Sequence, residues 1–248
     1  MTSTTKNRKF DDALTDERER AFDAAGTLEG TKLRIVTAAE RLFATYGIDG
    51  VTLQQILKGA GQRNSSAMHY HFGTKDALIE AILAWRMTGI DIHRNRMIDG
   101  LLKDGYERDI RAILATGVIP FTRPTDESSQ PSYYNRFLLE IHRNPGFSFD
   151  ELIAGKFDRG IQRMSELLYA QLSTLPDELR KPRIATIRAM IIYGVADIEA
   201  LRSKRLQEKR DFDLRRAVEN LIDMASGALI APVSKETCER LTAPSGKI

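Results

Sequence analysis

The sequence predicts an all-α protein in which an N-terminal three-helix helix-turn-helix domain precedes a larger helical bundle. Three observations predict this class. Apolar residues recur with helical spacing along most of the chain, glycines and prolines separate the periodic segments, and no alternating apolar and polar run typical of a strand is present. A chain of 248 residues is long enough for one small and one larger domain.

The composition limits the classes of function. Hydrophobic residues make up 42% and charged residues 29%, as in soluble globular proteins. No apolar run is long enough to span a membrane, and the first residues lack the apolar core of a signal peptide, so we expect a cytoplasmic protein without a membrane partner. The single cysteine, Cys238, excludes an intramolecular disulfide and a cysteine metal cluster. Because the formal net charge is only +3, any contact with DNA must be local.

Changes in composition and periodicity divide the chain into four expected parts. These are a flexible N-terminal tail (1–29), a helix-turn-helix domain (30–78), a helical domain (79–232) and a C-terminal tail (233–248). Lys6, Arg8 and Lys9 could form an arm that reaches the minor groove of DNA. The acidic residues that follow them favour a solvated tail instead.

The first two helices have clear start and stop signals. Residues 31–46 place five apolar side chains on one face, and Gly47 ends the helix. The five are Ile35, Ala39, Leu42, Phe43 and Tyr46. Thr52 and Gln55 fit a capping box, in which a threonine cap is followed three residues later by glutamine. We therefore expect the second helix to run from Thr52 to Ala60 and to stop at Gly61.

A third short helix is expected from Asn64 or Ser65 to Phe72, with Gly73 as its stop and Thr74 as the cap of the next helix. Further helical segments are predicted at 75–103, 107–119, 131–143, 150–173, 177–206 and 212–229. The residues that separate them include Gly105, Pro120, Pro124, Pro131, Pro145, Gly146 and Pro176.

The third helix presents a polar face suited to a DNA groove. Ser65, Ser66, His69 and Tyr70 share this face. Met68 and Phe72 share another face, which we expect to pack. In the helix-turn-helix arrangement the third helix enters the major groove, where small hydroxyl groups permit a close approach and donors bind phosphates or base edges.

These residues carry a resemblance to a known family. The runs IVTAAERLFATYG, IDGVTLQQILKGAG and HYHFGTKDAL, within residues 31–80, resemble the DNA-binding domain of the TetR/AcrR family of transcriptional regulators. Between Gly61 and Phe72 this chain is one residue longer than the commonest pattern of the family, and His69 stands where a tyrosine is usual.

The resemblance implies roles for individual residues. It implies that Thr52 and His69 bind phosphates, that Lys75 meets the DNA backbone, and that Gln54, Ser65, Ser66 and Tyr70 approach base edges. Arg63 and Asn64 lie in the longer turn, and Arg63 suits either guanine or a phosphate. His71 fits a core edge as well as a DNA contact. Ala39, Leu42, Phe43, Ile56, Met68 and Phe72 are expected in the core.

For the second domain the resemblance implies a bundle that binds a small effector. The candidate effector-binding residues are Trp85, Tyr133, Tyr134, Phe137, Leu138, Met164, Leu168 and Tyr193. Wide apolar side chains with polar tips fit an apolar or amphipathic molecule, although each of these residues fits an ordinary core position as well. A bundle that holds a protein partner instead of a small molecule is the main alternative.

Two apolar stripes on the last two long helices fit a dimer interface or the core of one subunit. The first stripe comprises Ile184, Ile187, Met190, Ile191, Val195 and Ile198, and the second Leu214, Val218, Leu221, Ile222, Ala225 and Leu229. The resemblance implies a homodimer through these helices on an inverted-repeat operator, most simply a repressor that an effector releases from double-stranded DNA.

The residues give no support to a catalytic or metal site. His69 and His71 point about 200° apart on a helix, and no further ligands complete a set. No nucleophile elbow, metalloprotease motif, P-loop or dinucleotide fingerprint is present. We therefore expect a protein that is not an enzyme and that uses neither a metal nor a cofactor.

Overall fold

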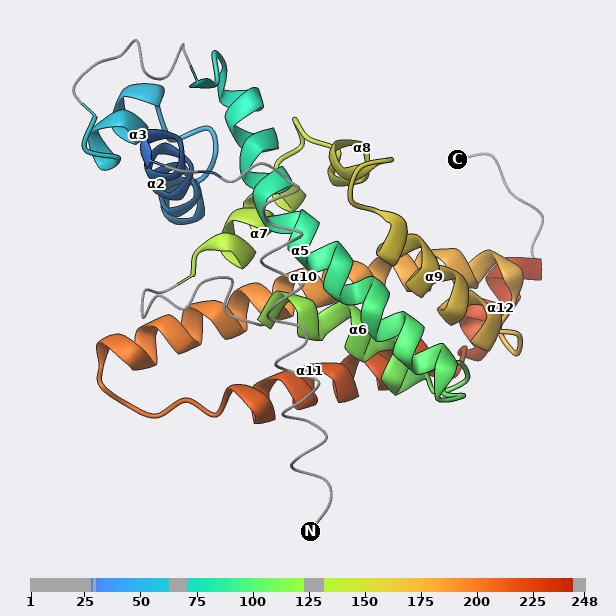
Figure 1. Cartoon of the computed structure of the whole chain (residues 1–248). Coiled ribbons are helices and arrows are strands. Elements are labelled where there is room, and N and C mark those ends of the chain that lie inside the picture. Colours follow the sequence, from blue (N-terminus) through green and yellow to red (C-terminus); the bar gives the residue numbers. More distant parts are fainter. Residues whose placement is uncertain (1–27, 29, 63–70, 123–131, 243–248) are drawn as a thin grey trace. The chain divides into compact units, whose positions relative to one another are not determined.

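The structure, a computed structural model, describes residues 28, 30–62, 71–122 and 132–242, and these residues confirm the all-α prediction (Figure 1). In chain order the helices are α2 (Gly30–Tyr46), α3 (Leu53–Gly59), α5 (Lys75–Lys103), α6 (Ile110–Thr122), α7 (Tyr134–Arg143), α8 (Phe149–Ile153), α9 (Arg159–Gln171), α10 (Asp177–Gln207), α11 (Leu214–Leu229) and α12 (Lys235–Thr242). No strand occurs within the described ranges. None of the described helices is both long and apolar enough to cross a membrane.

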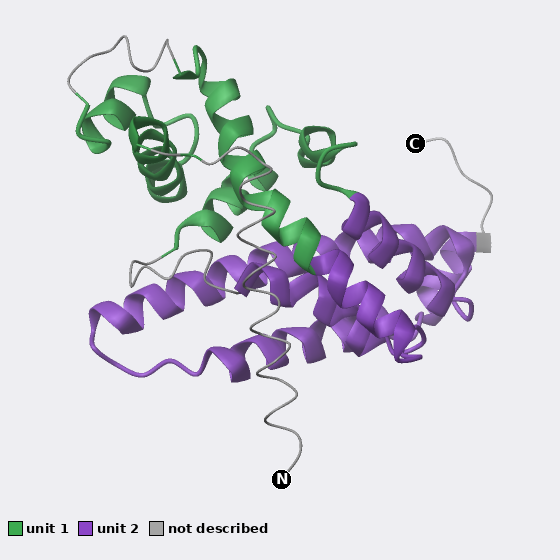
Figure 2. Cartoon of the chain, in the orientation of Figure 1, with its two compact units in different colours: residues 1–93, 125–158 green, residues 94–124, 159–248 purple. Residues whose placement is uncertain are grey.

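The chain folds into two compact units, each built from two separate stretches of sequence (Figure 2). Unit 1 comprises residues 1–93 and 125–158, and unit 2 comprises residues 94–124 and 159–248. Helix α5 contributes to both units, because the boundary falls between His93 and Arg94. The predicted helix-turn-helix segment therefore shares unit 1 with α7 and α8, which come from the middle of the chain.

The first helices of unit 1 end and begin at the predicted residues. Helix α2 ends at Tyr46, directly before Gly47, which has a φ of +77°, and the segment after α3 turns at Gly61 with a φ of +67°. The predicted stop at Gly73 also has a positive φ, of +73°. Positive φ angles strain residues that have a β-carbon, so glycine fits these turns. Thr74 Oγ1 accepts a hydrogen bond of 3.1 Å from the Ala77 amide, which confirms the predicted cap of α5.

The predicted core of these helices is confirmed only in part. Ala39, Phe43 and Ile56 are fully buried, whereas Leu42 and Phe72 are partly exposed. Tyr46, predicted on the apolar face, is 67% exposed at the last position of α2. Periodicity fixes the direction of a side chain but not whether another element covers the end of its helix. Met68 lies outside the described residues.

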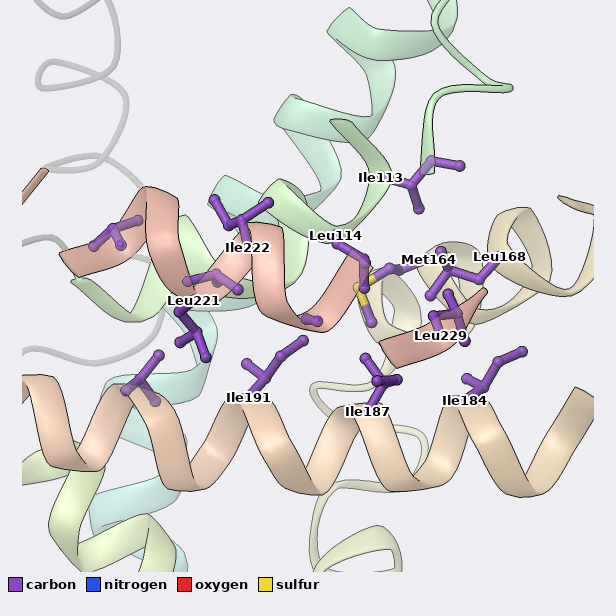
Figure 3. Packing of buried hydrophobic residues seen from close by; sticks show 14 of the residues in the cluster. Ile113, Leu114, Met164, Leu168, Ile184, Ile187, Ile191, Leu221, Ile222 and Leu229 are labelled. Atoms are coloured by element: carbon purple, nitrogen blue, oxygen red, sulfur yellow. The ribbon is translucent and has the colours of Figure 1, made fainter. Parts of the chain in front are cut away.

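Unit 2 is built around an aliphatic core contributed by α5, α6, α9, α10 and α11. Figure 3 shows Ile184, Ile187 and Ile191 pointing from α10 towards Leu221 and Leu229 of α11. Nearly all of both apolar stripes is buried in this core, and Met190 and Leu214 pack against it. Of the two interpretations open to the sequence, the structure supports a core within one subunit for these residues.

Helices α10 and α11 approach each other closely at one glycine. A β-carbon on Gly194 would lie 2.5 Å from Leu221 Cδ1, a distance that real β-carbons do not show. Larger side chains at position 194 would push the two helices apart. The small residue therefore sets the spacing of this helix pair.

Three predicted boundaries were wrong. The segment 150–173 is two helices, α8 and α9, interrupted where Gly155 has a φ of +67°. Pro120, predicted as a separator, lies inside α6 near its C-terminal end, where the loss of one helical hydrogen bond is tolerated. The predicted C-terminal tail contains α12, which was missed because a helix of eight residues carries little apolar periodicity.

Candidate nucleic-acid interface

The start of α3 is held by a complete capping box. The backbone amide of Gln55 donates to Thr52 Oγ1 at 3.3 Å, and the backbone amide of Thr52 donates to Gln55 Oε1 at 2.7 Å. The Thr52 hydroxyl also donates to Gln55 Oε1 at 3.0 Å. A phosphate only accepts hydrogen bonds, and a hydroxyl has one hydrogen. To bind a phosphate, the Thr52 hydroxyl would therefore have to give up its hydrogen bond to Gln55 Oε1.

Helix α3 also places polar side chains at the surface. Gln54, predicted near base edges, is exposed one residue before the capping glutamine, and Lys58 is exposed one turn later. The helix leads through the turn at Gly61 to residues 63–70. Six of the predicted DNA contacts fall in that segment and lie outside the described residues: Arg63, Asn64, Ser65, Ser66, His69 and Tyr70.

The predicted backbone contact Lys75 is engaged within unit 1. Its Nζ donates to the Ile48 carbonyl at 3.0 Å, which ties the first residue of α5 to the loop between α2 and α3. An ammonium group has three hydrogens, so a phosphate can bind to the same nitrogen without breaking this bond. The contact with Ile48 would then fix where the charge is presented.

His71 is half-buried and lies four residues before Lys75, the first residue of α5. Its ring lies beside that of Phe72, with ring centroids 6.1 Å apart, and Lys32 Nζ lies 6.0 Å from the Phe72 centroid. These contacts fit the interpretation of His71 as a residue at the edge of the core.

A buried ion pair fastens α2 to α5. Arg86 Nε lies 2.7 Å from Glu40 Oε2, and Arg86 Nη2 lies 3.0 Å from Glu40 Oε1, which makes a two-bond contact. Glu40 is only 2% exposed and Arg86 only 7%. The Arg86 guanidinium also lies 3.8 Å from the centroid of the Trp85 ring. A buried pair with this geometry resists changes in the angle between its helices, because each charge is costly to leave without the other.

Helix α7 packs against α2. The rings of Phe137 and Phe43 are stacked with centroids 6.0 Å apart. Beyond the end of α7, Asn144 Nδ2 donates to Asp49 Oδ2 at 2.9 Å. These contacts join α7 to α2 and to the loop that precedes α3. The helix-turn-helix elements therefore have a support that lies about one hundred residues further along the chain.

Comparison with known proteins finds a family that the first helices resemble. The model of the bacterial regulatory proteins of the tetR family matches residues 35–82, which include most of α2, all of α3 and the start of α5. Over these residues the chain is similar to the regulators of the tetR family.

One similar protein is the HTH-type transcriptional regulator SrpR of Pseudomonas putida. The two sequences are 33% identical over 72 residues, which cover 29% of this chain and 33% of that protein. The match thus spans about a third of the length of the relative. Similarity to it supports the family and leaves the rest of the chain to be interpreted from its own residues.

The eight predicted effector-binding residues divide between the two units. Unit 1 holds Trp85, Tyr133, Tyr134, Phe137 and Leu138. Of these, Tyr134, Phe137 and Leu138 are buried, whereas Trp85 and Tyr133 are half-buried next to Arg86 and Arg136 respectively. Unit 2 holds Met164 and Leu168, which are part of its core, and Tyr193, which is 48% exposed. Their role in binding an effector stays a prediction.

The sequence interpretation missed the pair formed by Glu40 and Arg86. The sequence does contain a signal for this pair, because each of the two charged residues lies three or four positions from apolar residues and so falls on the apolar face of its helix. Glu40 follows Val36 by four residues and precedes Phe43 by three, and Arg86 follows Leu83 by three. A single charge on an otherwise apolar face predicts a buried ion pair only when its partner is known. Here the partner is 46 residues away, beyond the reach of a local pattern.

Proposed function

We propose that this chain is a DNA-binding transcriptional regulator that acts as a homodimer on an inverted-repeat operator and is most simply a repressor released by a small effector. The observation that carries the proposal is the capping box of Thr52 and Gln55 at the start of α3, inside the segment that matches the tetR family. This cap fixes the helix that precedes the predicted recognition residues, and a helix-turn-helix domain needs such a fixed approach.

The DNA contacts of this proposal combine phosphate and base recognition. Thr52, Lys75 and His69 would hold phosphates, and Gln54 would approach base edges together with the polar face of residues 65–70. The exposed position of Gln54 and the hydrogen bond that orients Lys75 support these roles. Phosphate contacts set the register of a protein on DNA, and base contacts select the sequence.

Helix α5 supports the proposed response to an effector. It is one continuous helix from Lys75 to Lys103 with residues in both units, and its Arg86 is bound to Glu40 of α2. An effector that prefers one position of α5 would therefore also change the position of α2. A coupling free energy of about 1–3 kcal/mol would change operator affinity roughly 5- to 150-fold.

The proposed dimer would use α10 and α11, but not their buried stripes. Both helices carry large apolar side chains that the chain itself leaves exposed: Tyr193 and Leu201 on α10, Met224 on α11 and Ile230 at its end. Exposed apolar residues on adjacent helices are typical of surfaces that pair with a second copy. Sedimentation of a Met224→Glu variant would test this interface, since a dimer through α11 should dissociate.

The first experiment is DNA binding by the purified full chain. Affinity would be measured for DNA from beside its own gene and for random DNA of equal length, across a salt series. We expect selective binding with a protected inverted repeat. Equal affinity for both DNAs at every salt concentration would contradict the proposed function.

A set of three variants tests the division of labour. His69→Ala should weaken binding to all sequences alike, whereas Ser66→Ala and Tyr70→Ala should mainly reduce discrimination at one or two base positions. The control is His142→Ala, which removes an exposed histidine of α7 outside the proposed interface. Similar losses on operator and random DNA for all three variants would show that the assigned roles are wrong.

A further inference from the structure

The connection between α10 and α11 is rich in positive charge. We call residues 202–216 the basic turn; it comprises the end of α10, the linking segment and the first residues of α11 (Figure 1). It contains seven Lys or Arg and three Asp or Glu, whereas residues 30–80, with the predicted DNA-reading helices, contain six and four. Since the whole chain has a net charge of only +3, the positive excess is concentrated here.

Most of these charges have no acidic partner among the described residues. Arg210 lies 3.5 Å from Glu208, and Arg216 lies 3.9 Å from Asp213. The remaining five form no ion pair within the described chain: Arg202, Lys204, Arg205, Lys209 and Arg215. Lys204, Lys209 and Arg215 are also exposed, so their charges face solvent.

Four arginines elsewhere in unit 2 are used by the fold. Arg111 binds Glu219 and Asp223, Arg163 binds Asp99, and Arg180 binds Asp177. Arg183 donates to the carbonyls of Leu229 and Ala231 at 2.9 and 2.5 Å and so holds the C-terminal end of α11. The contrast indicates that the side chains of the basic turn serve something other than the stability of this unit.

Helix electrostatics accounts for only part of the basic turn. Lys204 and Arg205 lie in the last turn of α10, where positive charge favours the helix dipole. Arg215 and Arg216 lie in the first turn of α11, which has no acidic residue, and there positive charge opposes the dipole. Arg216 lies near the capping carboxylate of Asp213, whereas Arg215 has no acidic partner among the described residues and is better explained by a ligand of opposite charge.

The surroundings of the basic turn favour phosphates in a nucleic acid over a membrane. A helix that lies on a membrane needs an apolar face to insert, but the apolar face of α11 is buried in the core of unit 2. Leu206, 52% exposed, is the main apolar side chain at the surface of the turn. Arginine predominates over lysine in the turn, and its planar guanidinium binds phosphate oxygens through two hydrogen bonds.

We propose that the basic turn is a second DNA-binding surface, which holds the phosphate backbone of a duplex without reading its sequence. This inference rests on the proposed function, in which the polyanion already bound by the protein is DNA. The turn adds an interaction that depends on charge alone and that operator and random sequences share. Its contribution is therefore a steeper dependence of affinity on salt, because each neutralised phosphate releases condensed cations.

The test compares two triple variants of the full chain that remove the same number of charges. The turn variant is Lys204→Gln, Lys209→Gln and Arg215→Gln. The control variant is Lys103→Gln, Lys181→Gln and Arg240→Gln, which removes exposed, unpaired charges scattered over the rest of unit 2. Binding to random duplex DNA would be measured across a salt series, together with the duplex from beside the gene.

Log affinity decreases with log salt, and we expect this decrease to become less steep by about 1 for each phosphate that the protein no longer binds. The magnitude of the slope should therefore fall by up to about 3 in the turn variant and stay close to the wild-type value in the control variant. A turn variant with the slope of the wild type would overturn the proposal. An equal fall in both variants would also overturn it, since net charge alone would then explain the effect. Vesicles of anionic phospholipid give a further comparison. If the turn variant alone lost binding to these vesicles, and its salt dependence on DNA stayed that of the wild type, the ligand of the basic turn would be a membrane and not DNA.

Failure of the proposed function gives a different result. The wild type would then bind the two duplexes with equal affinity at every salt concentration. The comparison of slopes on random DNA would still decide whether the basic turn binds phosphates.

Discussion

The position of Pro120 inside α6 gives Arg94 a role that can be measured. Proline has no amide hydrogen, so the carbonyl four residues earlier, on Thr116, loses its helical hydrogen bond. Arg94 Nε donates to that carbonyl at 3.3 Å, and Arg94 is only 1% exposed. The buried arginine thus replaces the donor that the proline removed, and its guanidinium lies 5.3 Å from the centroid of the Phe121 ring.

The perturbation is Arg94→Met, made in the wild type and in Pro120→Ala. A hydrogen bond from a charged donor contributes about 1.5–3 kcal/mol, and an unsatisfied buried carbonyl costs about 1–3 kcal/mol. In the wild type Arg94→Met should therefore lower the free energy of unfolding by about 2–4 kcal/mol. With alanine at position 120, the new amide can satisfy Thr116, so the same substitution should cost about 1–2 kcal/mol less. The other interactions of Arg94 are removed in both backgrounds, so their contributions cancel.

The assay is equilibrium unfolding in urea, followed by far-ultraviolet circular dichroism and by tryptophan fluorescence. The single tryptophan, Trp85, lies in unit 1, so coincident transitions would show that the two units unfold together. The control is Arg180→Met, since Arg180 donates to the carbonyls of Ser173 and Leu175 and its cost should not depend on residue 120. Equal costs of Arg94→Met in both backgrounds, within about 0.5 kcal/mol, would refute the reasoning.

Three further predictions concern stability, each measured by the same urea unfolding. Glu40→Ala should cost about 3–5 kcal/mol because it leaves the charge of Arg86 buried without its carboxylate, and a cost below about 1 kcal/mol would show that the pair is solvated. Thr52→Ala should cost about 0.5–2 kcal/mol through loss of the cap, whereas Thr52→Ser should retain most of the stability; equal losses would exclude the hydroxyl as the cause. Gly194→Ala should destabilise by about 1–3 kcal/mol because its methyl group meets α11, whereas Gly227→Ala, in open space, should be neutral or stabilising by up to about 1 kcal/mol. The close packing of α10 and α11 would be wrong if both alanines had the same effect.

Local signals in the sequence predicted the start of the structure well. Each of these signals depends only on residues within four positions of it in the sequence. Four of them are confirmed: the caps at Thr52 and Thr74 and the stops at Gly47 and Gly61. The proposed recognition face, residues 65–70, lies outside the described residues and stays a prediction. So do the effector-binding residues, because a large buried side chain looks alike in a core and in a ligand site.

What the sequence determined by itself is the helical class, the resemblance of the first helices to the tetR family and the local ends of helices, because hydrogen bonds and dihedral preferences act over a few residues. Only the tertiary structure decided which apolar faces meet. It placed α7 on α2, paired Glu40 with Arg86, and buried in one subunit the stripes of α10 and α11 that also fitted a dimer. The first two of these contacts join residues about 100 and 46 positions apart, and hydrophobic burial has no direction that a periodic pattern could encode. The pattern shows that a face is covered, and the fold shows what covers it.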